Sequence, residues 1–217
     1  MAEVAIFDMD HTLIGVDCDM TWKSFAVAEK LAPASALETA DKFMADYDAG
    51  CLDMNEFLRF QWQEFRGLTP DEAASLAHRH FEKMILPHCR AKALQEVQEV
   101  KKAGYFTFLL TSTASVLAAP VAEYFKVDDF CGAEMEIRNG VITGSPAGIY
   151  PCGENKVVLA EKLIRKKNTT FSGARAYGDS INDLPLLSAC GRAFAVNPSA
   201  SLRQKAVENN WDILDWE

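Results

Sequence analysis

Short apolar runs that end in polar residues recur along the chain, and helical patterns separate them. The runs cover residues 4–7, 105–110, 174–177 and 193–196. Such runs are typical of strands that are buried on both faces of a parallel sheet. Because strands and helices alternate, the sequence predicts an α/β fold with a doubly wound, mainly parallel, Rossmann-like sheet.

Helices are expected between and after these strands, at residues 91–102, 156–167 and 202–208, where apolar residues recur at helical spacing. Gly104 follows the first of them, as is usual at a helix end. The dipeptide Asn139-Gly140 lies between short β-prone runs and predicts a hairpin over residues 134–143.

The segment 16–88 interrupts the alternation of strands and helices. Its pattern predicts helices near 19–31, 36–48, 53–66 and 70–86, and Gly50, Gly67 and Pro70 separate them. We interpret this segment as a helical cap that is inserted after the first strand. The catalytic core then comprises residues 1–15 and 89–217.

Composition limits the partners of the chain. Of the 217 residues, 49% are hydrophobic and the net charge is −9. An acidic surface repels nucleic acid and anionic membranes, so neither is expected as a partner. An anionic substrate would instead need a local cation, supplied by a metal ion or by a lysine or arginine.

Localisation and redox state follow from what the sequence lacks. The apolar run before Asp8 is too short for a signal peptide, and no stretch reaches the roughly 18 apolar residues of a membrane span. We therefore expect a cytoplasmic protein, either a monomer or a homodimer. The six cysteines show no C-x-x-C spacing, which disfavours a zinc site; we expect reduced thiols that mostly fill the core.

Polar clusters at 8–12, 111–113 and 178–183 follow predicted strands, and Pro185 marks the start of a helix after the last of them. In a parallel sheet the carboxyl ends of the strands meet at one edge, where ligands bind, so these clusters should share one crevice. Carboxylates that face one crevice repel each other unless a cation lies between them. The alternative is that Asn182 or Asp183 only caps the following helix. The carboxylates predicted to hold Mg²⁺ are Asp8, Asp10, Asp179 and Asp183.

Lys156 and Thr111 are the candidates for contacts to a phosphate group. Lys156 lies at the start of a helix, where its charge opposes the helix dipole, so an electrostatic role would explain its position. The alternative is an ordinary solvated lysine. Thr111 can donate a hydrogen bond to a phosphoryl oxygen, and the backbone N–H groups of Ser112 and Thr113 could add others.

Taken in order, these residues resemble the four motifs of the haloacid dehalogenase superfamily of phosphotransferases. The matching stretches are Asp8-Met9-Asp10-His11-Thr12, Thr111, Lys156, and Gly178-Asp179-Ser180-Ile181-Asn182-Asp183. The helical insert, residues 17–22 and residues 195–198 are similar to the phosphoserine-phosphatase-like branch. That branch usually continues its second motif as Ser-Gly-Gly, whereas this chain has Thr111-Ser112-Thr113. The resemblance is therefore to the branch rather than to phosphoserine phosphatase itself.

The resemblance implies an Mg²⁺-dependent phosphomonoesterase. Asp8 would attack phosphorus and form an aspartyl phosphate, and Asp10 would act as general acid and then as general base. Lys156, Thr111 and Ser112 would bind the phosphate group. Dehalogenases of this superfamily lack the second acid, so Asp10 favours phosphate chemistry. The expected substrate is a small phosphorylated metabolite such as phosphoserine or histidinol phosphate.

The same resemblance places Mg²⁺ among Asp8, Asp179 and the backbone carbonyl of Asp10, with Asp183 bound directly or through water. The cap would close over the crevice and contact the leaving group.

Several cap residues are candidates for leaving-group contacts. Asp17 or Asp19 could bind a substrate amine, although Asp19 could equally cap the helix that begins near Met20. Arg59 and Arg66 could bind carboxylate or phosphate, or be solvated. His11 is expected only to pack against or line the crevice, and His78, His80 and His88 are assigned no role.

Other functions use the same motifs. A phosphotransferase or mutase would transfer the phosphate to a second acceptor rather than to water, and a protein-directed phosphatase would need a more open cap. A catalytically silent phosphate-binding module would be expected to have lost Asp8, Asp10, Lys156 or Asp179, and this chain retains all of them.

Overall fold

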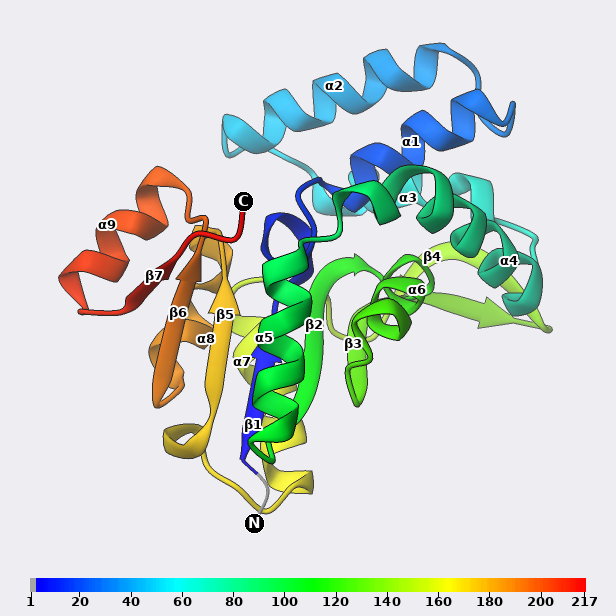
Figure 1. Ribbon diagram of the computed structural model, residues 1–217. Helices are drawn as coiled ribbons and strands as arrows, with labels where there is room; N and C mark the ends of the chain where they lie inside the picture. The colour runs from blue at the N-terminus through cyan, green and yellow to red at the C-terminus, as the bar shows by residue number, and fades with distance from the viewer. Residues whose placement is uncertain (1–2) are drawn as a thin grey trace.

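A seven-stranded sheet lies at the centre of the computed structural model, which describes residues 3–217 (Figure 1). Its strand order is β4-β3-β2-β1-β5-β6-β7, and all neighbours are parallel except the β3–β4 hairpin. The strands are β1 (Val4–Phe7), β2 (Phe106–Ala114), β3 (Asp129–Arg138), β4 (Val141–Ala147), β5 (Arg175–Gly178), β6 (Arg192–Val196) and β7 (Asp212–Leu214). The predicted doubly wound, mainly parallel α/β sheet is confirmed.

Helices cover both faces of the sheet and one of its ends. Those of the sheet layers are α5 (Ala91–Lys102), α6 (Ser115–Phe125), α7 (Glu154–Lys166), α8 (Leu184–Ala189) and α9 (Ala200–Glu208). The helices of the inserted segment are α1 (Cys18–Ala28), α2 (Ser35–Asp48), α3 (Met54–Gln61) and α4 (Pro70–His80). In Figure 1 these four, in blue to teal, lie together beyond the carboxyl ends of the strands.

Alternate residues of β1 serve two different cores, because successive side chains of a strand point to opposite faces. Ala5 and Phe7 join a cluster that includes α5, α6 and the aromatic residues of the cap. Val4 and Ile6 join a second cluster with α7, α8 and α9. All four are fully buried, so the chain leaves this strand at Asp8 from a rigid position.

Backbone hydrogen bonds hold the cap against the rest of the molecule at two places. Its two linkers pair with each other: Gly15 N–H donates to the His88 carbonyl at 2.9 Å, and Arg90 N–H donates to the Leu13 carbonyl at 3.0 Å. The segment after α3 pairs with β4, where Gly67 N–H donates to the Ile142 carbonyl and Ile142 N–H donates to the Leu68 carbonyl, both at 2.8 Å.

The structure corrects two expectations from the sequence and agrees with a third. Strand β2 runs on to Ala114, so residues 111–113 lie within it rather than after it. Helix α6 and strand β7 were not predicted; α6 is buried on most of its surface and contains Pro120, so it shows no amphipathic period. All six cysteines are free, as expected: Cys18 is buried in the core, Cys89, Cys131 and Cys190 are partly buried and pack against it, and Cys51 is exposed.

Within residues 3–217, no helix combines the length and the apolar character needed to cross a membrane.

Candidate active site

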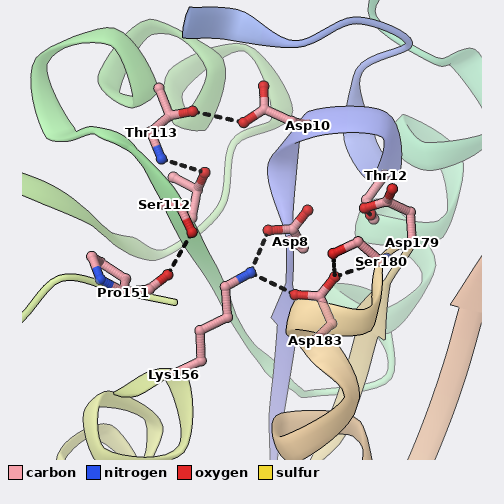
Figure 2. Close-up of polar contacts among 11 residues, drawn as sticks. Asp8, Asp10, Thr12, Ser112, Thr113, Pro151, Lys156, Asp179, Ser180 and Asp183 are labelled. Carbon is pink, nitrogen blue, oxygen red and sulfur yellow. Dashed lines mark hydrogen bonds and ion pairs between the residues drawn. The ribbon is translucent and has the colours of Figure 1, made fainter. Parts of the chain in front are cut away.

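The carboxyl ends of the central strands bring the predicted polar residues together (Figure 2). Asp8 follows β1, Thr111 lies in β2, and Asp179 follows β5. The Asp8 N–H donates to the Tyr177 carbonyl at 2.9 Å, which ties β1 to β5 beside the site. Lys156 reaches the same place from the first turn of α7.

Lys156 is a buried cation between two carboxylates and not a solvated lysine, since it is only 2% exposed. Its ammonium donates to Asp8 Oδ1 at 2.6 Å and to Asp183 Oδ1 at 2.5 Å. Burial by itself would lower the pKa of Lys156, but the neighbouring carboxylates of Asp183 and Asp8 outweigh it and raise that pKa. The ammonium therefore stays charged at neutral pH.

Asp8, Asp179 and Asp183 form a carboxylate cluster in which one oxygen of each lies within 4.8 Å of the others. Burial raises the pKa of Asp8 to about 6 and that of Asp179 to about 8, although Lys156 opposes both shifts. One ammonium is too little positive charge for this cluster. Hard carboxylate oxygens at this spacing fit a divalent cation such as Mg²⁺.

Asp183 does not cap α8 with its side chain. Instead its Oδ2 accepts from the Ser180 N–H at 3.2 Å, while Oδ1 accepts from Lys156. Asn182 lines the cleft beside Asp179. The alternative that Asp183 only caps the following helix is therefore wrong.

Asp10 points away from the other acids, toward Thr113 (Figure 2). Its Oδ2 accepts from the Thr113 hydroxyl at 2.6 Å, and its Oδ1 accepts from the Cys18 N–H at 2.8 Å. Burial, and then the charges of Asp17 and Asp8, raise the pKa of Asp10 well above its usual range. The structure thus gives Asp10 a different setting from the carboxylate cluster: a fixed carboxyl group that holds a proton readily.

The second predicted motif forms one wall of the site. Thr111 Oγ1 accepts from the Thr113 N–H at 3.1 Å, which leaves its own hydroxyl hydrogen free to donate. The Ser112 hydroxyl donates to the Pro151 carbonyl at 2.7 Å, so its hydrogen is already used within the protein. The contact of Thr113 with Asp10 was not foreseen from the sequence, which suggested a role only for the Thr113 N–H.

A cavity of about 290 Å³ opens between these residues and the cap. Its volume suits a small ligand. The core contributes polar side chains, among them Asp8, Asp10, Thr111, Ser112, Lys156 and Asp179. The cap contributes Asp17 and Asp19 together with an apolar group made of Met20, Phe43, Met44, Leu52, Met54 and Phe57.

The residues near or in the cap that the sequence singled out lie in different surroundings. Asp17, not Asp19, caps α1, since its Oδ1 accepts from the Met20 N–H at 2.8 Å. Arg59 and Arg66 are exposed and are not among the residues that line the cavity. His11 does line it, from an exposed position with φ of 56°.

Comparison with known proteins agrees with this geometry. The family model for haloacid dehalogenase-like hydrolases matches residues 5–188. Histidinol-phosphatase from Neisseria meningitidis serogroup C (strain 8013) is 31% identical over 222 residues, covering all of both chains.

Two solved structures extend the comparison. A protein of unknown function from Bordetella pertussis Tohama I superposes with a TM-score of 0.93 at 31% identity over the whole of both chains. A phospho-aspartyl intermediate analogue of phosphoserine phosphatase has a TM-score of 0.72 at 18% identity, covering 100% of this chain and 94% of that one, which shows a shared fold. The chain therefore belongs to the haloacid dehalogenase-like hydrolases, and it is an enzyme of the phosphatase type, as its four motifs predicted.

Proposed function

We propose that the protein is an Mg²⁺-dependent phosphomonoesterase that hydrolyses a small phosphorylated metabolite through an aspartyl phosphate on Asp8. The observation that carries this proposal is the arrangement of Asp8, Asp179 and Asp183 around one buried lysine. A nucleophilic carboxylate, a group of hard oxygen ligands and a fixed cation are what phosphoryl transfer requires.

Asp8, Asp179 and Asp183 would hold the Mg²⁺ ion, with the backbone carbonyl of Asp10 nearby. When bound, the ion supplies positive charge that offsets the repulsion between an anionic nucleophile and an anionic phosphate. Lys156 adds a second positive charge, and the Thr111 hydroxyl and the Ser112 N–H donate hydrogen bonds to phosphoryl oxygens.

The reaction would proceed in two displacements. A carboxylate oxygen of Asp8 attacks phosphorus, the bond from phosphorus to the leaving oxygen breaks, and Asp10 gives its proton to that oxygen. Water then attacks phosphorus and passes a proton to Asp10, and the bond from phosphorus to Asp8 breaks. The products are the alcohol and inorganic phosphate.

The helical segment 16–88 would act as a cap that excludes bulk water and contacts the leaving group. Its apolar residues close one side of the cavity. Phosphoserine and histidinol phosphate are the model substrates that the relatives suggest.

The proposal is tested by measuring phosphate release from p-nitrophenyl phosphate and from histidinol phosphate with Mg²⁺, with EDTA, and with Asp8→Asn. Turnover should need Mg²⁺ and should fall by at least about 1,000-fold in Asp8→Asn, which removes the nucleophile. Asp41→Asn is a matched control, because Asp41 is an exposed residue of α2. Near-normal turnover by Asp8→Asn would show that Asp8 is not the nucleophile.

A further inference from the structure

Tyr150 is an aromatic residue of the core that lines the cavity. It belongs to the loop between β4 and α7, and it packs against the larger hydrophobic cluster, which includes aromatic residues of the cap. The other aromatic residues that line the cavity besides His11, namely Phe43 and Phe57, come from the cap. Tyr150 therefore extends the core toward the side of the cavity where a leaving group would lie.

The groups around the phenol of Tyr150 place its hydroxyl at the cavity. Burial raises the pKa of Tyr150 well above its usual value, and Asp19 and Cys152 raise it further, whereas Ser112 and Lys156 oppose the shift. These four residues come from different parts of the chain, and all of them line the cavity. The phenol thus lies between the phosphate-binding wall and the cap, and it is a neutral hydroxyl at neutral pH.

Hydrogen bonds hold the loop that carries Tyr150 in place. The Tyr150 carbonyl accepts from the Cys152 N–H at 2.9 Å and from the Asn155 side chain, in the first turn of α7, at 3.0 Å. The Pro151 carbonyl accepts from the Ser112 hydroxyl, which ties the loop to β2 (Figure 2). A hydroxyl carried by such a loop needs little rearrangement to meet a ligand.

The cavity offers many acceptors and few donors to a leaving group. Among the described residues outside the four motifs and β2, its lining consists of apolar side chains, the carboxyl groups of Asp17 and Asp19, the thiol of Cys152 and the phenol of Tyr150. Ionised carboxyl groups only accept hydrogen bonds, and a thiol donates weakly. The phenol is therefore the strong donor of this set that does not depend on the protonation of a carboxyl group.

A neutral acceptor on the leaving group is the natural partner of this hydroxyl. An ether oxygen, a hydroxyl oxygen or an unprotonated ring nitrogen loses its hydration when it enters a cavity lined by apolar side chains. Such an acceptor costs free energy if it stays unpaired there. A hydrogen bond from Tyr150 would remove that cost, whereas a hydrocarbon leaving group would gain nothing from the phenol.

We propose that Tyr150 is a specificity-determining residue, whose hydroxyl donates a hydrogen bond to a neutral oxygen or nitrogen acceptor of the leaving group. Because the phenol lies near Ser112, the acceptor should be only a few bonds from the phosphate. The chemical class that fits is the phosphomonoesters of alcohols with such an acceptor. This inference rests on the proposed phosphomonoesterase activity and adds to it a residue from outside the four motifs.

Two esters of nearly equal shape test the inference. 2-Methoxyethyl phosphate has an ether oxygen where butyl phosphate has a methylene group. The specificity ratio is kcat/KM for 2-methoxyethyl phosphate divided by kcat/KM for butyl phosphate, both measured with Mg²⁺. Tyr150→Phe should lower this ratio by about 5-fold, as for the loss of one neutral hydrogen bond. Intrinsic differences in reactivity between the esters cancel when two variants are compared.

An unchanged specificity ratio in Tyr150→Phe would overturn the proposal. So would an equal loss of kcat/KM for both esters, because a hydroxyl that only stabilises the loop would serve both alike. Turnover of butyl phosphate shows in the same assay that the variant is folded. Tyr124→Phe is the matched control and should keep the ratio, because Tyr124 is an exposed residue of α6.

Two further variants examine the other groups of the cavity that could donate. His11→Gly removes the imidazole at a position whose φ of 56° suits glycine. Asp19→Asn removes a carboxyl group that could donate when protonated. If the specificity ratio falls in one of these variants and stays unchanged in Tyr150→Phe, the donor is not Tyr150 and the proposal is wrong.

The failure of this inference can be told from the failure of the proposed function. Turnover of p-nitrophenyl phosphate that needs Mg²⁺ and Asp8, together with a specificity ratio that Tyr150→Phe leaves unchanged, would overturn the inference alone. The absence of turnover for all three esters would overturn the phosphomonoesterase proposal and, with it, the inference that rests on it.

Discussion

The core side of the cleft supplies a cation to its carboxylates, and the cap side supplies none. Lys156 lies between Asp8 and Asp183, so the core acids share an ammonium before any ligand arrives. On the cap side, the Oδ1 of Asp19 has no hydrogen-bond partner among the described residues, and Asp19 lines the cavity together with Phe43 and Phe57. The comparison suggests that the two sides have different roles. The polar groups of the core are already paired in the arrangement that would bind a phosphate group, whereas a polar group of the cap would gain a partner only when a leaving group binds.

Removing the core cation should give the largest effect. Lys156→Met leaves the buried carboxylates without a counter-charge, so we expect kcat/KM to fall by at least about 1,000-fold and the free energy of unfolding by about 3 kcal/mol. Phosphate release and urea unfolding measure the two quantities. Lys205→Met is the control, because Lys205 pairs with Glu208 on the exposed surface. If Lys156→Met and Lys205→Met changed activity and stability equally, the prediction that Lys156 is the essential counter-charge of the core carboxylates would be wrong.

Removing the hydrogen bond that holds Asp10 should give a smaller loss of activity, and only for substrates whose leaving group needs a proton. Thr113→Val removes the hydroxyl that donates to Asp10, and we expect kcat/KM for ethyl phosphate to fall by about 10-fold. The kcat/KM for p-nitrophenyl phosphate should change little, because its leaving group departs without a proton. Thr113→Ser should restore the rate for ethyl phosphate. An equal loss for both esters would indicate a general packing defect rather than a role in positioning Asp10.

The smallest effect concerns stability on the cap side, where His80 is buried. Burial lowers the pKa of His80 to about 4. The unfolded chain takes up this proton near pH 6.5 and the folded chain only near pH 4, so protonation favours unfolding as the pH falls between these values. His80 should therefore cost the protein about 2 kcal/mol of stability between about pH 7 and pH 5.

His80→Gln should reduce that loss, measured as the change in the free energy of urea unfolding between the two pH values. His78→Gln is the control, since the side chain of His78 is 53% exposed. If His80→Gln and the wild type lose the same stability on acidification, His80 is not the source of the sensitivity.

Much of the core side could be predicted from sequence because its residues follow from local patterns. Asp8 comes at the end of a buried strand, Asp179 follows another, and Lys156 begins a helix, so topology alone brings them together. The contact between Thr113 and Asp10 could have been suspected from strand alternation, since residues 111 and 113 share a face once β2 is known to extend that far.

The cap side was harder to predict because its features depend on contacts between distant segments. The sequence predicted the helices of the cap correctly but not the residue that caps α1. Asp17 and Asp19 are both suitable capping residues, and only the structure shows that Asp17 accepts from the Met20 N–H. Lys23, one turn further along α1 than Asp19, is bound instead to Glu64 and to the Phe60 carbonyl, which lie on other helical turns. No periodicity in the sequence records such a choice of partner.

The contact between Cys18 and Asp10 has a consequence for how this enzyme can change over time. The donor is the backbone N–H of Cys18, at the first position of α1. Every amino acid except proline supplies that hydrogen, so a replacement that fits the buried position of the thiol side chain would leave the donor in place. The side chain at position 18 can thus change only among small groups that the core accommodates, while the donor that orients Asp10 belongs to the main chain and does not depend on which of them is present.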